Sequence, residues 1–219
     1  MPTSTWERLP QARRAAVISA AEAEFAEHGF SGGSLNVIAR EAGVAKGSLF
    51  QYFHDKVDLY SYLSERASTR IRGDMEPVIA SLPWQTDFFG AFEDLTVAWV
   101  AYFRSHPLEL AMTVAVNLEP DRSARTAVRR VANEHYLSVL EPLLRTAKDS
   151  GALRPDADIE AFLSLLLVLL PHVAVAPSSP GLDPVLGLSS PDHDDQVAAA
   201  KRLVAVLRAA FEPAPVGVA

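Results

Sequence analysis

The sequence predicts an all-α fold of about nine helices, and two observations support this prediction. Apolar residues recur every three or four positions along almost every segment, and no segment shows the strict alternation typical of a β-strand. Proline, glycine and serine cluster between the periodic segments, where they are expected to end one helix and begin the next. The chain has 219 residues, of which 49% are hydrophobic, and is therefore long enough to bury a sizeable core in one or two domains.

The first third of the chain is expected to contain four helices, at about residues 13–28, 34–41, 45–53 and 55–71. Gly29 is expected to end the first helix in the left-handed conformation, and Ser34 to cap the second. Gly43 separates the second helix from the third. Asp55, with Asp58 three residues later, forms a partial capping box at the start of the fourth.

Five further helices, most of them longer, are expected in the remainder of the chain, at about residues 88–105, 107–118, 123–150, 158–175 and 194–211. Proline at position 107 suits the first position of a helix, and Gly151 is expected to close the longest one. The stretch 176–191 is rich in proline, glycine and serine, and we expect it to be a long mobile loop.

The composition excludes several functional classes. The chain has no cysteine, which rules out disulfides, thiolate zinc sites, cysteine nucleophiles and iron–sulfur clusters. It contains no GxSxG, P-loop or HExxH motif, and its six histidines show no metal-ligand spacing. We therefore expect neither an enzyme nor a bound cofactor.

A cytoplasmic protein with no membrane partner is expected. The N-terminus has no apolar run behind its charges, so it is not expected to be a secretory signal. The most apolar stretch, residues 162–175, is interrupted by Ser164, Pro171 and His172, and we expect it to fall short of the roughly 20 residues that a membrane span needs.

The net charge of −7, taken alone, argues against a nucleic-acid partner, because phosphates select for basic surfaces. The first 60 residues, however, carry six Lys and Arg against seven Asp and Glu, so the acidity lies mostly in the rest of the chain. A near-neutral N-terminal region predicts few phosphate contacts and a shallow dependence of binding on salt.

Residues 38–50 predict a helix-turn-helix, since two short helices are joined there by a turn of three to four residues. Ala39 is small enough for the second helix to cross close to it, and Gly43 supplies the positive φ of the turn. Val44 is expected to be buried between the two helices. The second helix begins with small or polar residues, and its free N–H groups and positive dipole favour phosphate.

The pattern extends beyond these two helices. Its members are Arg14, Val17-Ile18, Ala20-Ala21, Phe25, Gly29-Phe30, Ile38-Ala39, the run from Ala42 to Phe50, Tyr52-Phe53 and Lys56. This pattern resembles that of the TetR/AcrR family of bacterial transcriptional regulators. The resemblance implies a three-helix helix-turn-helix domain over residues 1–56 and a helical effector-binding and dimerisation domain over residues 57–219.

The resemblance also implies a set of DNA contacts. Ser34 and Asn36 match the residues of the family's second helix that meet the DNA, and Lys56 matches a phosphate anchor. The contacts implied for the recognition helix in the major groove come from Lys46, Gly47, Ser48, Gln51 and Tyr52. By their chemistry, the Gln51 side chain can pair with an adenine edge and that of Lys46 with a guanine.

Two departures from the family pattern predict weaker phosphate anchoring. Ala45 stands where the family has a serine or threonine cap, so a hydroxyl is missing. Phe50 stands where the family has a tyrosine, so a hydrogen bond to phosphate cannot form.

A homodimer is expected, because one helix-turn-helix reads only one half-site. The last two helices are the candidate interface, since residues 163–170 are almost uniformly apolar and must be buried on two sides. The residues expected to form this interface are Leu163, Leu167, Leu170, Val197, Val204, Leu207 and Phe211. Burial wholly within one chain is the alternative.

The expected effector is a small hydrophobic molecule, such as a fatty acyl compound, because the candidate lining is mostly apolar. The candidates are Trp99, Phe103, Leu110, Met112, Asn117, His135, Tyr136, Leu140 and Leu166. An aromatic stripe at helical spacing can equally be plain core.

The resemblance implies allosteric repression: a dimer occupies a palindromic double-stranded DNA operator, and a bound effector releases it. Effector binding would shift the helix that begins near Lys56, so that the recognition helices no longer fit successive grooves. The coupling required is about 1–3 kcal/mol. The alternative is a helical ligand-binding or interaction protein that acts without DNA.

Overall fold

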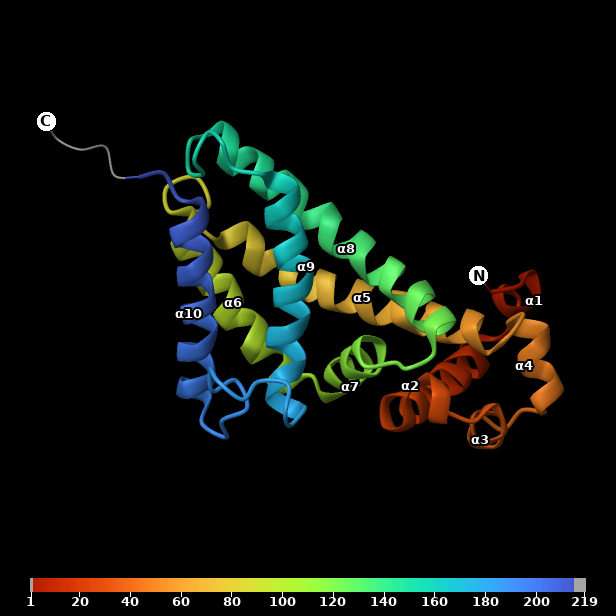
Figure 1. The fold of residues 1–219 in the computed structure, drawn as a ribbon. Coiled ribbons are helices and arrows are strands. Elements are labelled where there is room, and N and C mark those ends of the chain that lie inside the picture. The colour runs from red at the N-terminus through yellow and green to blue at the C-terminus, as the bar shows by residue number, and fades with distance from the viewer. Residues whose placement is uncertain (1, 215–219) are drawn as a thin grey trace, which may run out of the picture. The chain divides into compact units, whose positions relative to one another are not determined.

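The computed structural model describes residues 2–214, and these form ten α-helices and one 3-10 turn (Figure 1). In chain order they are α1 (Ser4–Glu7), α2 (Gln11–Gly32), α3 (Leu35–Glu41), α4 (Lys46–Tyr52), α5 (Lys56–Ser81), α6 (Phe88–Ser105), α7 (Pro107–Asn117), α8 (Arg122–Asp149), α9 (Ile159–Val175), η1 (Ala176–Ser178) and α10 (His193–Phe211). The nine expected helices are all present, which confirms the all-α prediction. The additional helix is α1.

The described residues divide into two compact units. Unit 1 comprises the residues up to Arg72 together with His106–Glu134, and unit 2 comprises Gly73–Ser105 together with the residues from His135 onward. Helices α5 and α8 contribute residues to both units. The expected division into a helix-turn-helix domain over residues 1–56 and an effector-binding domain over residues 57–219 stays a prediction.

Unit 1 is built around α2, which packs against α3 and α7. Its core contains the apolar face expected for the first helix, with Val17, Ala21 and Phe25 fully buried. The Tyr60 ring of α5 packs edge-on against Phe25, with the ring centroids 5.0 Å apart. This core fixes the helices on which the helix-turn-helix is carried.

Two glycines of unit 1 adopt the left-handed conformation that the sequence predicts. Gly29 has a φ of 64° and Gly43 a φ of 65°. At Gly29 the chain kinks and then continues as one more helical turn to Gly32, so the first helix is longer than expected. Asp55 caps the start of α5 as expected, since its carboxylate accepts from the N–H of Asp58 at 2.8 Å. Asp58 accepts from the N–H of His54, one residue before the cap, at 3.2 Å.

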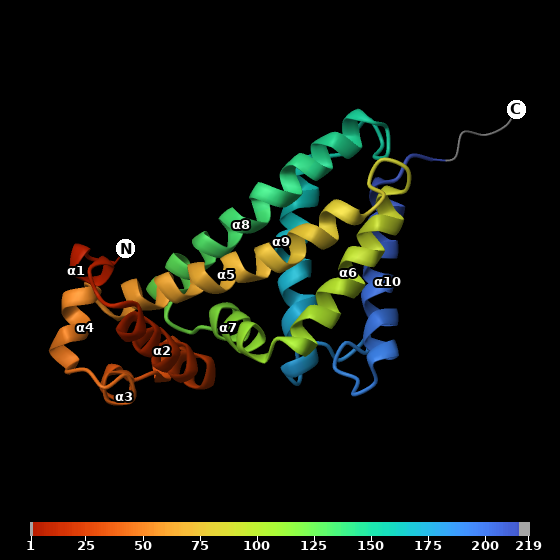
Figure 2. The same ribbon diagram turned by 180° about the vertical axis from the view of Figure 1, so that it is seen from behind.

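Unit 2 is a helical bundle in which α9 and α10 both pack against α6 (Figures 1 and 2). The Phe162 ring of α9 stacks on Phe211 of α10, with the centroids 4.1 Å apart. The apolar stretch of α9 is longer than expected, since Ile159–Ser178 covers 20 residues at a mean hydropathy of 2.2 and could cross a membrane by length and composition alone. Half of that window is buried inside the protein.

The stretch between α9 and α10 contains the 3-10 turn η1 and internal hydrogen bonds, and the mobility expected from its composition stays a prediction. The Asp183 carboxylate accepts backbone N–H groups from Val185 at 3.2 Å, Leu186 at 2.8 Å and Leu188 at 2.5 Å. Burial opposes the charge, but these bonds outweigh it and hold the pKa of Asp183 below its usual value. The composition of the loop could not show that Asp183 accepts hydrogen bonds from three backbone N–H groups of the same loop.

An ion-pair network ties three helices of unit 1 together. Arg70 of α5 donates to Glu22 of α2 at 2.8 Å and to Glu109 of α7 at 2.7 Å. Both carboxylates are buried, at 7% and 8% exposure. Burial alone would lower the pKa of Arg70, but hydrogen bonds to Glu22 and Glu109 raise it, so the guanidinium stays charged between them.

Substituting Arg70→Leu is therefore expected to destabilise the protein by about 2–3 kcal/mol, because two buried carboxylates lose their shared cation. Urea unfolding followed by circular dichroism measures this change. Arg130→Leu is the matched control, since Arg130 pairs with Glu134 on the surface, where both side chains are more than 60% exposed. The control is expected to cost less than about 1 kcal/mol. Equal losses in the two variants would contradict a structural role for the network.

Candidate nucleic-acid interface

The two short helices α3 and α4 are joined by a tight turn (Figure 1). The Gly43 N–H donates to the carbonyl of Arg40 at 3.1 Å, and the Val44 N–H to that of Ala39 at 2.9 Å. Ala39 is 4% exposed. The small residue and the positive-φ glycine therefore stand where the sequence predicts them, and the motif is a helix-turn-helix.

The apolar faces of both helices point into the core of unit 1. Ile38 of α3 is fully buried, Leu49 of α4 is 3% exposed, and Phe53 after α4 is 2% exposed. Val44 is half-buried at the turn. The inward face of α4 is thus used for packing, and its other face is free for a ligand.

The helix starts differ in how they are capped. The Ser34 hydroxyl accepts from the Val37 N–H at 3.5 Å, and the N–H of Ser34 itself donates to the Glu24 carboxylate at 2.8 Å. Ala45, at the corresponding place before α4, makes no side-chain cap bond. The first N–H groups of α4 therefore lack a side-chain acceptor from their cap residue.

The outward face of α4 carries Lys46, Gly47, Phe50 and Gln51, all of them exposed. These positions share one side of the helix because residues three and four apart are neighbours. Ser48 is half-buried. On α3 and before it, Asn36 is exposed and Ser34 is half-buried.

Neither the backbone conformation nor the packing of the protein requires a glycine at position 47. Its φ is not positive, and a Cβ built on it would meet no atom within 4 Å. Glycine inside a helix costs about 1 kcal/mol relative to alanine. Internal packing thus gives no reason for a glycine here, whereas a close approach to a ligand backbone would give one.

Two residues expected to contact DNA are placed differently from this exposed group. Tyr52 is 5% exposed, and its ring packs 5.8 Å from Trp6, so it supports α4 from inside. Lys56 is half-buried, and its Nζ lies 4.5 Å from the centroid of the Phe30 ring. Burial lowers the pKa of Lys56, and the nearby charges of Glu119, Glu24 and Asp121 partly oppose this effect.

The N-terminal segment supports α4, and the sequence did not predict it. The Thr3 N–H donates to the Tyr52 carbonyl at 2.9 Å, and the Thr3 hydroxyl donates to the Gln51 carbonyl at 2.5 Å. Trp6, 3% exposed, packs with its ring 4.9 Å from that of Phe53. These bonds satisfy carbonyls at the C-terminal end of α4. The helix α1 has only four residues and is too short to show periodicity. The one signal in the sequence for a buried segment there was Trp6.

The residues predicted to bind an effector are divided between the units. Leu110, Met112 and Asn117 belong to unit 1, and the other six to unit 2. Met112 is 1% exposed in the core of unit 1, and the Asn117 side chain is bonded to Thr113 and Arg129.

The aromatic part of the predicted lining is packed within unit 2. The Trp99 indole N–H donates to the Leu170 carbonyl at 3.0 Å. Its ring lies 4.9 Å from that of Phe103 and 6.0 Å from that of Tyr136. Leu140 and Leu166 are buried, and His135 is half-buried.

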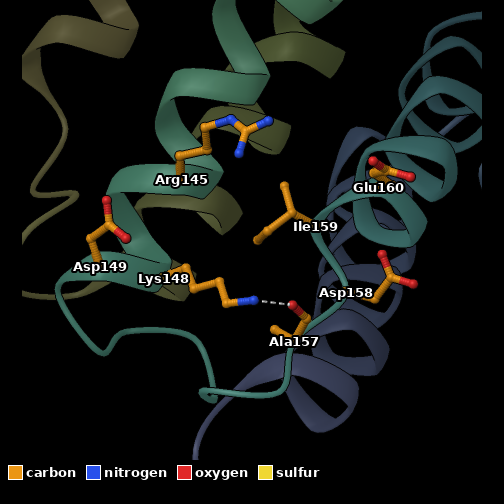
Figure 3. A pocket seen from close by; sticks show the side chains of 7 residues that line it. All are labelled: Arg145, Lys148, Asp149, Ala157, Asp158, Ile159 and Glu160. Atoms are coloured by element: carbon orange, nitrogen blue, oxygen red, sulfur yellow. Dashed lines mark hydrogen bonds between the residues drawn. The ribbon is translucent and has the colours of Figure 1, made fainter.

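A surface pocket of unit 2 lies at the end of α8 and the start of α9, and it is lined by charged residues (Figure 3). Lys148 donates there to the Ala157 carbonyl at 2.7 Å. None of the residues predicted to bind an effector lines it. Within residues 2–214, no group of three or more His, Asp or Glu side chains is placed to hold a metal ion.

The residues predicted to form a dimer interface lie mostly inside unit 2. Leu163, Leu170, Val204, Leu207 and Phe211 are all 7% exposed or less, and Leu167 and Val197 are half-buried. The large apolar side chains left exposed on these helices are instead Leu165 at 48%, Val168 at 70% and Val206 at 66%.

The fold and the motif together define a helix-turn-helix protein with additional helices. Residues 17–63 match the family model described as bacterial regulatory proteins, tetR family. Over 188 residues the chain is 27% identical to the transcriptional repressor AcnR of Corynebacterium glutamicum, a match that covers 82% of this chain and 91% of AcnR. Residues 17–63 thus carry the helix-turn-helix region of the tetR family of bacterial regulatory proteins, and most of the chain is similar to a transcriptional repressor.

Solved structures show the same fold. FadR of Bacillus subtilis, in complex with stearoyl-CoA, superposes with a TM-score of 0.65 at 18% identity, covering 88% of this chain and 96% of FadR. The complex of SmeT with triclosan superposes with a TM-score of 0.66 at 20% identity, covering 95% of each chain.

The variant Gly47→Ala is expected to change stability and DNA binding in opposite directions. The added methyl group should stabilise α4 by about 0.5–1 kcal/mol, because alanine is the better helix former. It should weaken binding to DNA by at least several-fold, because it projects from the exposed face. Urea unfolding and fluorescence anisotropy with operator DNA measure the two effects.

Ser19→Ala is the matched control for Gly47→Ala, since Ser19 is exposed in α2 and the change also favours helix. Its DNA affinity should stay unchanged. A Gly47→Ala protein that binds DNA as tightly as the wild type would show that this glycine does not face the DNA.

Proposed function

We propose that this protein is a dimeric repressor that binds a palindromic operator through α3 and α4 and is released by a small hydrophobic effector. The observation that carries this proposal is the outward face of α4, where Lys46, Gly47 and Gln51 are exposed and a Cβ built on Gly47 would meet no atom within 4 Å. The opposite face of the same helix is buried in unit 1. A cytoplasmic location goes with this function.

The proposed contacts fall into two kinds. Lys46 and Gln51 are proposed to read base edges in the major groove, and Gly47 to allow a close approach. Ser34, Asn36 and Ser48 are proposed to make further DNA contacts around them. Lys56 is proposed to meet a phosphate, and Tyr52 to act through its support of α4 rather than from the surface.

A hydrophobic effector is the class of ligand that the comparisons favour. FadR was solved with stearoyl-CoA, which carries a long apolar acyl chain on a charged coenzyme A group, and SmeT with triclosan, a small apolar aromatic compound. The residues proposed to bind the effector of this chain are the apolar and aromatic side chains predicted for it, Trp99, Phe103, Leu140 and Leu166 foremost. A ligand that binds one of two states more tightly needs a coupling of only about 1–3 kcal/mol to release DNA.

The dimer is proposed to form through the apolar side chains that α9 and α10 leave exposed. Leu165 and Val168 lie three residues apart on α9, and Val206 is exposed on α10. Large apolar side chains left exposed on the surface are typical of an interaction surface. A dimer would place two recognition helices about 34–36 Å apart, as successive major grooves require.

Operator binding is tested by gel shift and footprinting with the DNA that flanks the gene of this protein. Gln51→Ala is expected to weaken binding by about 1–3 kcal/mol and to relax the preference at one base pair. Lys46→Ala is expected to weaken binding as well. Arg40→Ala is the matched control, because Arg40 is exposed and paired with Glu41. Full binding by both Gln51→Ala and Lys46→Ala would reject α4 as the recognition helix.

Val168→Asp is expected to convert the dimer to a monomer, because a charge would be buried in the proposed interface. Sedimentation equilibrium at micromolar concentration measures the mass. Val185→Asp is the control, since Val185 is 80% exposed in the loop before α10. The control should remain a dimer. A wild-type protein that sediments only as a monomer would contradict the dimer proposal.

A further inference from the structure

We propose that Glu119 is a positioning residue for DNA binding, which holds the segment between α2 and α3 against the turn between α7 and α8. The proposal rests on the proposed function, because it concerns the same helix-turn-helix. Glu119 is not part of the motif and lies 88 residues from the nearest part of the segment that it binds. All the groups involved belong to unit 1.

The Glu119 carboxylate uses both oxygens. Oε2 accepts from the backbone N–H of Phe30 at 3.0 Å and from that of Ser31 at 3.3 Å. Oε1 accepts from the Ser31 hydroxyl at 2.5 Å and from the N–H of Asp121 at 2.8 Å. Glu119 is 2% exposed, so these four donors replace its hydration.

The need for this acceptor arises from the kink at Gly29. The left-handed conformation there interrupts the helix, so the N–H groups that follow cannot reach the usual helical carbonyls. Phe30 and Ser31 are the two residues directly after the kink. A carboxylate supplied by a distant turn satisfies them, and the kink is thereby tied to α7 and α8.

A second carboxylate holds the other end of the same segment. Glu24 of α2 is 9% exposed and accepts from the N–H of Ser34 at 2.8 Å. Ser34 is the cap of α3 and one of the proposed DNA contacts. The five residues from Phe30 to Ser34, which set where α3 begins, are therefore held by one carboxylate at each end.

The charged and titratable groups around Glu119 come from three elements. Lys56 of α5 stands over the Phe30 ring, and its charge interacts with those of Glu119, Glu24 and Asp121. Tyr60 of α5 is fully buried, and burial together with the charge of Glu119 raises the pKa of its phenol. Although burial opposes the charge, the hydrogen bonds from Ser31, Asp121 and Phe30 lower the pKa of Glu119, so it is ionised at neutral pH.

The consequence concerns regulation. A state of the protein in which the α7–α8 turn moves away from α2 must either carry the kink with it or break these bonds. In the first case the start of α3 shifts, and α4 shifts with it through the turn at Gly43. In the second case the segment before α3 keeps only the restraint from Glu24. Glu119 therefore transmits the position of the α7–α8 turn to the DNA-contacting helices.

The test substitutes Glu119→Gln in the full-length protein and measures operator affinity by fluorescence anisotropy. The amide keeps one acceptor oxygen, and its NH2 group then faces either the N–H groups of Phe30 and Ser31 or that of Asp121. We expect operator affinity to fall roughly tenfold, the loss typical of removing a hydrogen bond to a charged acceptor. Glu134→Gln is the matched control, since Glu134 is exposed and pairs only with Arg130 among the contacts described above. Its affinity should equal that of the wild type.

A measurement in sucrose or trimethylamine N-oxide separates positioning from simple destabilisation. These osmolytes restore the folded population of a destabilised variant. If Glu119 positions α3, the tenfold loss persists when unfolding curves show that the variant is fully folded. If the affinity returns to the wild-type value under those conditions, the residue is structural only and the proposal is overturned. Hydrogen exchange of the Phe30 and Ser31 amides should be faster in the variant throughout.

Should Glu119→Gln not fold, Ser31→Ala decides the question, because it removes only the hydroxyl bond and keeps both backbone bonds. An affinity loss of about threefold is expected, and wild-type affinity would overturn the proposal. A wild-type protein that binds no DNA would refute the proposed function itself. Wild-type binding that Glu119→Gln and Ser31→Ala leave unchanged would refute only the role of Glu119.

Discussion

A helix of seven residues has almost no stability of its own, so the position of α4 depends entirely on what packs against it. Leu49 and Phe53 bury one face in unit 1, the turn at Gly43 fixes its start, and Thr3 and Trp6 hold its end. Each of these restraints acts from the inner side or from the helix ends. The outer face of α4 is not needed to hold the helix in place. For this physical reason we assign it to DNA binding.

The overall net charge is a poor guide to the charge that DNA would meet. Unit 1 carries 13 Lys and Arg against 12 Asp and Glu, whereas unit 2 carries 7 against 15. The acidity of the chain is therefore concentrated in the unit without the helix-turn-helix. The net charge of −7 argued against DNA binding, but this argument concerns unit 2 and not the unit that carries the helix-turn-helix.

The parts that the sequence could predict are those governed by local rules. Gly29 and Gly43 were identifiable because few other residues adopt a positive φ, and Asp55 because capping acts over three residues. Periodicity located the long helices, but it could not show which apolar side of α9 and α10 faces inward. Leu163 and Val204 were assigned to a partner and lie in the core, whereas Val168 and Val206 are exposed. Pairings between distant residues, such as Glu119 with Ser31, leave no local pattern at all.

The same pairings also change the balance of charge on the surface of unit 1. Four of its twelve acids are buried: Glu22 and Glu109 share Arg70, and Glu24 and Glu119 accept backbone N–H groups. These four carboxylates interact with groups inside the protein. Without them and Arg70, unit 1 has eight Asp and Glu residues and twelve Lys and Arg residues. A buried carboxylate that satisfies a kink or a helix cap therefore does two things at once. It holds the segment that leads into the helix-turn-helix, and it keeps a negative charge off the surface of unit 1.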